Sequence, residues 1–150
     1  MHGLKDHRDI IVVVALGRRG ATLPEGTVVP ENARVVDFIP FDDLLPYCAA
    51  FITNGGYGAV QHGISTGVPM IIAGATEDKP EVAARAEWAG VAINLRTGRP
   101  SAGQVQLAVQ EIFDNGKYKA RSLELEEESK RYVAMDIVEK TIQDVAAAKI

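Results

Sequence analysis

The feature that most constrains the fold is a regular alternation of short apolar runs with segments of helical character. The run at residues 10–16 is largely β-branched and has no polar residue. That pattern is typical of a strand buried on both faces of a parallel sheet. Four further runs predict strands, at residues 34–39, 49–53, 68–73 and 91–95. Because helical segments separate the later runs, the sequence predicts an α/β layered sheet with right-handed crossovers.

Local signals define several helix ends. Gly67 and Gly90 are typical helix stops, and Pro80 suits the first position of a helix. Ser101 and Gln104 have the spacing of a capping box for a helix that runs to about Phe113. From Lys117 onward the chain is helical in character, and Val138, Ile142 and Val145 recur at helical spacing. We expect that apolar face to be docked.

Composition excludes several classes of function. The chain has 150 residues, a hydrophobic fraction of 47% and a net charge of −4, which gives no basic footprint for nucleic acid or for an anionic membrane surface. The longest apolar run is too short to span a bilayer. The single cysteine cannot form an internal disulfide, which suits a reducing compartment. These features predict a cytoplasmic protein with no nucleic-acid or membrane partner.

The stretch at residues 51–71 holds five glycines between two predicted strands. A strand, a glycine-rich turn and a helix bring free backbone N–H groups and the positive end of the helix dipole together, which suits phosphate. Tight strand-to-helix packing without a ligand is the alternative. Two other loops, at residues 17–20 and 74–80, also leave strand ends, and ligands bind beyond the carboxyl ends of such strands.

The order of these motifs resembles the donor-binding lobe of family 1 nucleotide-sugar glycosyltransferases. The motifs are strand, "TNGGYG", helix, "GVP", strand and "ATEDKPEVAAR". The family includes UDP-glucuronosyltransferases and macrolide transferases, and its members have two Rossmann-like lobes (the GT-B fold). The resemblance runs from about Asp9 to the C-terminus and covers one of the two lobes. It implies a UDP-sugar or a similar nucleotide sugar as donor substrate and no metal.

The resemblance also implies a donor site. Its residues are Phe38, Ile39, Asn54, Gly55, Gly56, Gly58, Ala59, His62, Asp78 and Lys79. The first two flank the nucleobase, with Ile39 reading the base edge through its backbone. The turn that begins at Asn54 contacts the diphosphate, His62 faces the ribose, and the last two meet the donor sugar. Each residue also has a structural reading, as a turn, surface or packing residue.

Several positions depart from the family pattern. Asn54 replaces a His and brings no positive charge, and Phe41 occupies a position often held by Gln. His62 replaces a Glu, and a neutral imidazole accepts one hydroxyl bond where a carboxylate accepts two. Asp78 keeps the family's acid, while Lys79 replaces a Gln and could reach a phosphate or a carboxylated sugar.

Two features of a complete transferase are not found in the sequence. Inverting transfer needs a base for the acceptor hydroxyl, and the sequence offers no catalytic residue for that role. The family's donor lobe also opens with a further strand and helix, so residues 1–150 are interpreted as a single donor lobe that lacks its first strand–helix unit and the acceptor lobe. We therefore expect a donor-binding portion that is inactive without a separate acceptor lobe. A non-catalytic nucleotide-binding or protein-interaction module is the alternative. The uncovered sheet is expected to cause self-association, with exchange of an element such as the C-terminal helix between copies as one route. A monomer whose C-terminal helices fold back over the gap is the alternative.

Overall fold

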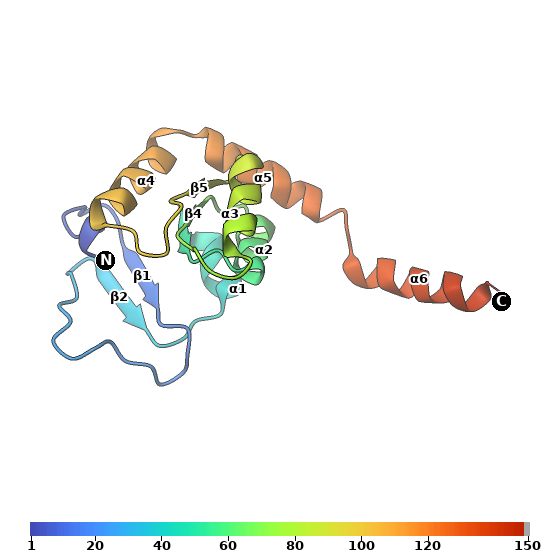
Figure 1. The fold of residues 1–150 in the computed structure, drawn as a ribbon, viewed down its shortest axis with the longest axis horizontal. Coiled ribbons are helices and arrows are strands. Elements are labelled where there is room, and N and C mark those ends of the chain that lie inside the picture. The colour runs from blue at the N-terminus through green and yellow to red at the C-terminus, as the bar shows by residue number, and fades with distance from the viewer. Residues whose placement is uncertain (149–150) are drawn as a thin grey trace.

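The computed structural model describes residues 1–148, and its five strands are all parallel to their neighbours. Strands β1 (Val12–Ala15) and β2 (Ala33–Val36) form one pair. Strands β3 (Phe51–Thr53), β4 (Met70–Ile72) and β5 (Ala92–Asn94) form a second sheet with β4 in the middle. Every strand overlaps the run that predicted it. The predicted α/β class with parallel strands is confirmed (Figure 1).

Helices follow β2, β3, β4 and β5, whereas β1 leads directly to β2. The helices are η1 (His2–Leu4), α1 (Phe41–Leu44), η2 (Leu45–Tyr47), α2 (Tyr57–Ser65), α3 (Lys79–Trp88), α4 (Ala102–Asp114), α5 (Lys117–Ser129) and α6 (Ala134–Ala147). The capping box at the start of α4 is confirmed. The Gln104 backbone N–H donates to Ser101 Oγ at 3.2 Å, and the Ser101 N–H donates to Gln104 Oε1 at 2.9 Å.

The core is organised around β4, whose three side chains are fully buried. Met70 and Ile72 pack on one side into a cluster with Val60 of α2 and Ala83 of α3. Ile71 points to the other side, where it packs under α4. Helices therefore cover both faces of the β3–β5 sheet, as the sequence predicted.

Strand β1 departs from the prediction, because one of its faces is only partly buried and the other is exposed. Val12 joins the cluster under α4, whereas Ile11 is 73% exposed and Val13 is 38% exposed. The prediction of burial on both faces is therefore wrong for this strand. The physical reason is that residues 17–32, which link β1 to β2, form no helix to cover the second face.

Strands β1 and β3 each have an unpaired edge on the side opposite to their partner strand. The N–H groups of Val12 and Leu16 donate toward β2, so the peptide groups of Val13 are directed to the opposite edge. In β3, the Phe51 N–H and the Thr53 carbonyl pair with β4, which leaves Ile52 facing the other way. Within residues 1–148, no strand pairs with either of these edges. Strand β2 lies on the paired side of β1, and β4 and then β5 lie on the paired side of β3.

Helix α6 also departs from the prediction. Val138, Ile142 and Val145 are 49%, 63% and 69% exposed, and α6 has no buried residue. Figure 1 shows α6 reaching away from the rest of the described chain. The prediction of a docked face is wrong for this structure, because α6 leads away from the sheets and no element among residues 1–148 covers it.

Gly55, in the turn after β3, is required by the close approach of two neighbouring strands. Its φ is +77°, and a Cβ at this position would collide with Cγ2 of the buried Ile72. Only glycine adopts this backbone conformation without strain. Gly56 differs, since its φ is −61° and its Cβ position is open apart from the Asn54 side chain at 3.8 Å.

We therefore predict that Gly55→Ala lowers the free energy of unfolding by about 2–4 kcal/mol, from backbone strain and overpacking. Urea denaturation monitored by circular dichroism measures this change. Gly56→Ala is the matched control and is expected to change the same quantity by less than about 1 kcal/mol. Equal effects of the two substitutions would contradict the packing role of Gly55.

Candidate donor-binding edge

The loops that leave β3 and β4 meet at one edge of the second sheet. Gly74 follows β4 and lies so close to Asn54 that a Cβ would collide with the Asn54 carbonyl oxygen. The same Cβ would lie 2.9 Å from Cβ of Lys79. Two residues that the sequence assigned to different parts of the site, Asn54 and Lys79, are therefore brought together on either side of Gly74.

The turn after β3 is held by its own side chains. Thr53 Oγ1 accepts a hydrogen bond from the Gly55 N–H at 3.2 Å, and Asn54 Oδ1 accepts one from the Gly56 N–H at 3.3 Å. The N–H groups of Gly55 and Gly56 therefore already have hydrogen-bond partners within the turn. Asn54 therefore shapes the turn through its side chain, and the diphosphate contact predicted for it remains a prediction.

The start of α2 presents backbone donors. Its first intrahelical bond runs from the Val60 N–H to the Gly56 carbonyl at 3.1 Å, and no side chain caps the helix. The N–H groups of residues 57–59 therefore have no partner within the helix. A Cβ on Gly58 would meet no atom within 4 Å. The predicted residues Gly56, Gly58 and Ala59 thus lie at an accessible helix start with the polarity that favours anions.

Phe38, predicted to flank the nucleobase, lies at the exit of β2 with 41% of its surface exposed. The guanidinium of Arg19, from the loop after β1, lies 4.8 Å from the centroid of its ring. The Asp37 carboxylate joins the two loops, because it accepts from the N–H groups of Gly20 and Phe38, each at 2.7 Å. These two bonds lower the pKa of Asp37. Ile39 follows, and its peptide groups make no hydrogen bond within residues 1–148.

The loop after β4 holds the predicted sugar-binding pair. Asp78 is exposed at the start of α3. Lys79 forms an ion pair with Glu77, and this hydrogen bond lowers the pKa of the Glu77 carboxyl. Glu77 has a φ of +58°, a strained conformation for a residue with a side chain. The ammonium of Lys79 thus has a carboxylate partner within its own loop.

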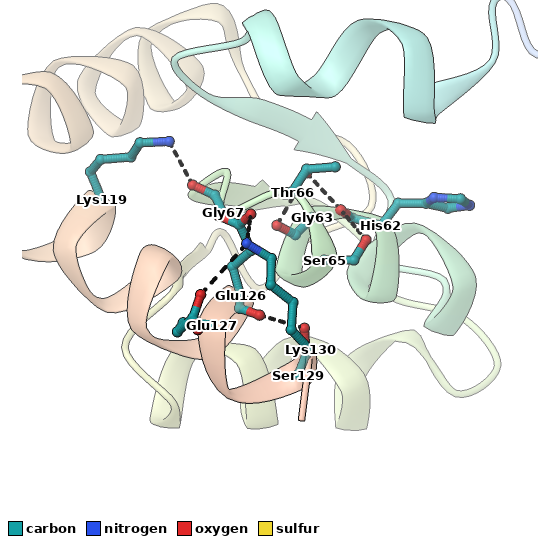
Figure 2. Close-up of polar contacts among 10 residues, drawn as sticks. All are labelled: His62, Gly63, Ser65, Thr66, Gly67, Lys119, Glu126, Glu127, Ser129 and Lys130. Atoms are coloured by element: carbon teal, nitrogen blue, oxygen red, sulfur yellow. Dashed lines mark hydrogen bonds and ion pairs between the residues drawn. The ribbon is translucent and has the colours of Figure 1, made fainter. Parts of the chain in front are cut away.

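His62 lies on α2 and contacts a residue that the sequence did not single out. Its Nδ1 is 2.9 Å from Asp42 Oδ1 on α1. Its ring packs edge-on against Phe41, with centroids 5.5 Å apart, and Phe41 packs in turn on Phe51. The Phe41 side chain, at a position where the family often has Gln, therefore supports the imidazole. In Figure 2 the imidazole points away from the polar contacts that join α2 to α5.

The signal for Asp42 was present in the sequence. The carboxylate follows the exit of a predicted strand by a few residues, in "FIPFDD". The sequence does not predict that α1 packs close to α2, which brings Asp42 to His62. The same holds for Arg19, whose place over Phe38 depends on the bond between Asp37 and Gly20.

Other site types find no support in the described part of the chain. No group of three His, Cys, Asp or Glu side chains in residues 1–148 is placed to hold a metal ion. No helix in that range is long and apolar enough to cross a membrane. A hollow of about 400 Å³ lies between the end of α3 and the start of α5, lined by residues that include Gly90 and Arg121. Gly90 precedes β5, so this hollow lies away from the carboxyl ends of the strands.

Comparison with known proteins agrees with the fold described above. Residues 5–143 match the model of the family described as erythromycin biosynthesis protein CIII-like, C-terminal domain. UDP-glucosyltransferase 1 of Beauveria bassiana (strain ARSEF 2860) is 52% identical over 147 residues, which are 98% of this chain and 32% of that protein. UDP-glucosyltransferase A1 of Starmerella bombicola is 48% identical over 147 residues, again 98% of this chain and 32% of that protein. The chain thus spans about a third of the length of these curated relatives.

Solved structures show the same likeness. The glycotransferase of kitacinnamycin has a TM-score of 0.80 and 25% identity, over 93% of this chain and 37% of that one. Glycosyltransferase VinC in complex with DTDP has a TM-score of 0.63 and 29% identity, over 67% of this chain and 26% of that one. With a family model matched along most of its length, the chain belongs to the erythromycin biosynthesis protein CIII-like C-terminal domain family, within the GT-B glycosyltransferases.

Proposed function

We propose that this chain binds the nucleotide-sugar donor of a glycosyltransferase. The observation that carries the proposal is the uncapped start of α2, where the N–H groups of residues 57–59 have no helical partner and Gly58 leaves their approach open. A diphosphate fits such a helix start through both the donors and the helix dipole. The exposed ring of Phe38 offers a stacking surface for the nucleobase.

The donor sugar is proposed to lie beside the loop after β4. Asp78 is exposed there and is the acid that the family pattern keeps. Carboxylates accept hydrogen bonds from sugar hydroxyls. The neighbouring Lys79 is paired with Glu77, so its predicted contact with a phosphate or a carboxylated sugar requires that pair to open. The fungal relatives are named UDP-glucosyltransferases, which supports a UDP-sugar as the donor.

Sugar transfer is proposed to require a second, acceptor-binding lobe. The chain spans about a third of its curated relatives, and the sequence offers no candidate for the base that takes the proton of the acceptor hydroxyl. The alternative is a module that binds nucleotide or a protein partner without catalysis. A neighbouring coding region for an acceptor lobe would favour the first reading over the second. The cytoplasmic location expected from the single cysteine remains a prediction.

A strand between β1 and β3 is proposed to complete this lobe. In a doubly wound sheet the chain runs outward in both directions from a central strand, and the order β2–β1 and β3–β4–β5 leaves that place between the two free edges. A crossover helix would then cover the exposed face of Ile11 and Val13. This agrees with the first strand–helix unit that the family resemblance implied.

We predict that UDP binds at the start of α2 and that Gly56→Val weakens its binding at least tenfold. Valine suits the φ of −61° at this position and has room in the fold, but its side chain would occupy the approach to the helix amides. Isothermal titration calorimetry measures the affinity. Gly116→Val is the matched control, because Gly116 is also an open N-cap glycine with a φ of −59°, at the start of α5. Unchanged affinity of folded Gly56→Val would mean that the turn is only structural.

We predict that the purified chain transfers no sugar to a hydroxyl acceptor. The reason is that neither an acceptor-binding surface nor a base for the acceptor hydroxyl has been identified in it. A radiolabelled UDP-glucose assay with a panel of small acceptors tests this, with donor hydrolysis counted separately because water needs no acceptor site. Sustained turnover that depends on both donor and acceptor would refute the prediction.

We predict that the isolated chain self-associates through the free edge and exposed face of β1. Unpaired strand edges and apolar faces recruit partners. Light scattering over a concentration series measures the mass, and Ile11→Lys is expected to shift it toward the monomer. Val28→Lys is the matched control, since Val28 is 72% exposed and Ile11 73%, but Val28 lies in the loop between β1 and β2. A wild-type monomer at high concentration would contradict the prediction.

A further inference from the structure

Helix α5 begins with cations that do not suit its own start. Lys117 and Lys119 lie in its first turn and Arg121 follows directly, while the first turn has no acidic residue and no side-chain cap. Positive charge near a helix N-terminus opposes the helix dipole. Two of the three cations have their partners at the ends of other helices.

Lys119 holds the C-terminal end of α2. That end closes with a Schellman motif, in which the Val68 N–H donates to the Gly63 carbonyl at 3.0 Å. The Gly67 N–H donates to the Ile64 carbonyl at 3.1 Å in the same motif. Lys119 Nζ donates to the carbonyl of the buried Gly67 at 2.7 Å (Figure 2). No backbone N–H among residues 1–148 donates to that oxygen, so the ammonium supplies the partner that a buried carbonyl needs.

Arg121 makes the corresponding contact with α3. Its Nε donates to the carbonyl of Ala89, the C-cap residue of that helix, at 3.1 Å. Helix α5 also packs tightly on both helices. Its Leu125 joins the cluster that α2 and α3 share, and a Cβ on Gly67 would collide with the side chain of Glu126. Helix α5 therefore holds α2 and α3 at their C-terminal ends.

The opposite ends of the same two helices form the proposed donor edge. Helix α2 begins with the amides of residues 57–59, and α3 begins directly after Asp78. The two helices have nine and ten residues, so the contacts with α5 lie about 13–15 Å from those ends. Lys119 and Arg121 are too far away to touch the diphosphate or the sugar. Any effect that they have on the donor must pass through the helices.

We propose that Lys119 and Arg121 are positioning residues for the donor. Lys119 sets the direction in which α2 presents its amides to the diphosphate, and Arg121 sets the place of Asp78 beside the sugar. The proposal rests on the proposed function and adds to it two residues that the donor does not contact. A brace that only stabilises the fold is the alternative, and it would affect every ligand alike.

The test compares uridine, UDP and UDP-glucose on the whole chain, because each ligand adds one group to the one before it. Nuclear magnetic resonance titration of isotope-labelled protein measures weak and tight binding alike. A smaller folded fraction lowers all three apparent affinities by the same factor. The ratios between the ligands therefore separate positioning from stability.

Lys119→Met keeps the aliphatic stem of an exposed side chain and removes its donor. It is expected to weaken UDP and UDP-glucose about fivefold and to leave uridine within about twofold, since hydrogen bonds weaken steeply away from their best angle. Lys119→Gln, a second neutral variant with a shorter side chain, is expected to give the same pattern. Arg121→Met is expected to weaken UDP-glucose about fivefold and to leave UDP and uridine within about twofold, for the same reason.

Lys117→Met is the matched control, because it removes the same charge from the same turn of α5. Within residues 1–148, Lys117 Nζ pairs with Glu111 of α4 at 3.6 Å and makes no hydrogen bond to α2 or α3. Exposed pairs of this kind contribute little, so all three affinities are expected to stay within about twofold. Lys119→Arg keeps a donor for the Gly67 carbonyl and is expected to restore UDP binding to within about twofold of the wild type.

The outcomes separate the positioning role from the proposed function. Suppose that the wild-type chain binds UDP. If Lys119→Met then weakens all three ligands alike or none of them, if Lys117→Met has the same effect, or if Arg121→Met weakens UDP as much as UDP-glucose, the positioning role is overturned while the proposed function stands. If the folded wild-type chain binds none of the three ligands, the proposed function is overturned and the positioning role with it.

Discussion

The burial of β4 is the constraint on which the rest of the structure depends. Its three side chains are inaccessible to solvent and divide between two clusters, so the strand positions α2 and α3 on one face and α4 on the other. Two glycines allow neighbouring elements to approach β4 closely. A Cβ on Gly55 would collide with Ile72, and a Cβ on Gly63 would collide with Met70. The core therefore supports the turn at which the ligand is proposed to bind.

The glycines of one turn thus have two different purposes. Gly55 is turned inward against Ile72 with a left-handed backbone, whereas Gly56 and Gly58 have ordinary or open surroundings and nothing inside the chain that needs their small size. The sequence presented packing and phosphate binding as alternatives for the same stretch. The structure assigns the packing explanation to Gly55 and leaves Gly56 and Gly58 without one, which is why the ligand proposal depends on them.

Sequence patterns correctly predicted the structural features that depend on residues close together in the chain. The buried run at 68–73 and the capping box of Ser101 and Gln104 are specified by neighbours in the chain, and both are confirmed. The exposed face of β1 and the undocked α6 were not predicted. An apolar run indicates that its side chains favour burial, but it does not indicate whether another element of the chain packs against them. The contact of Asp42 with His62 depends on how two helices meet, which no local pattern records.

The proposed donor edge has few cations available for a diphosphate. Asn54 carries no charge, Lys79 is paired with Glu77, the guanidinium of Arg19 lies over the ring of Phe38, and the chain has a net charge of −4. The proposed binding is therefore expected to depend on the orientation of the amides at the start of α2 more than on Coulomb attraction. Orientation is what the packing of Gly55 on Ile72 supplies, since it fixes the turn from which α2 begins. The stability of the core and the affinity of the site are thus expected to be coupled through that contact.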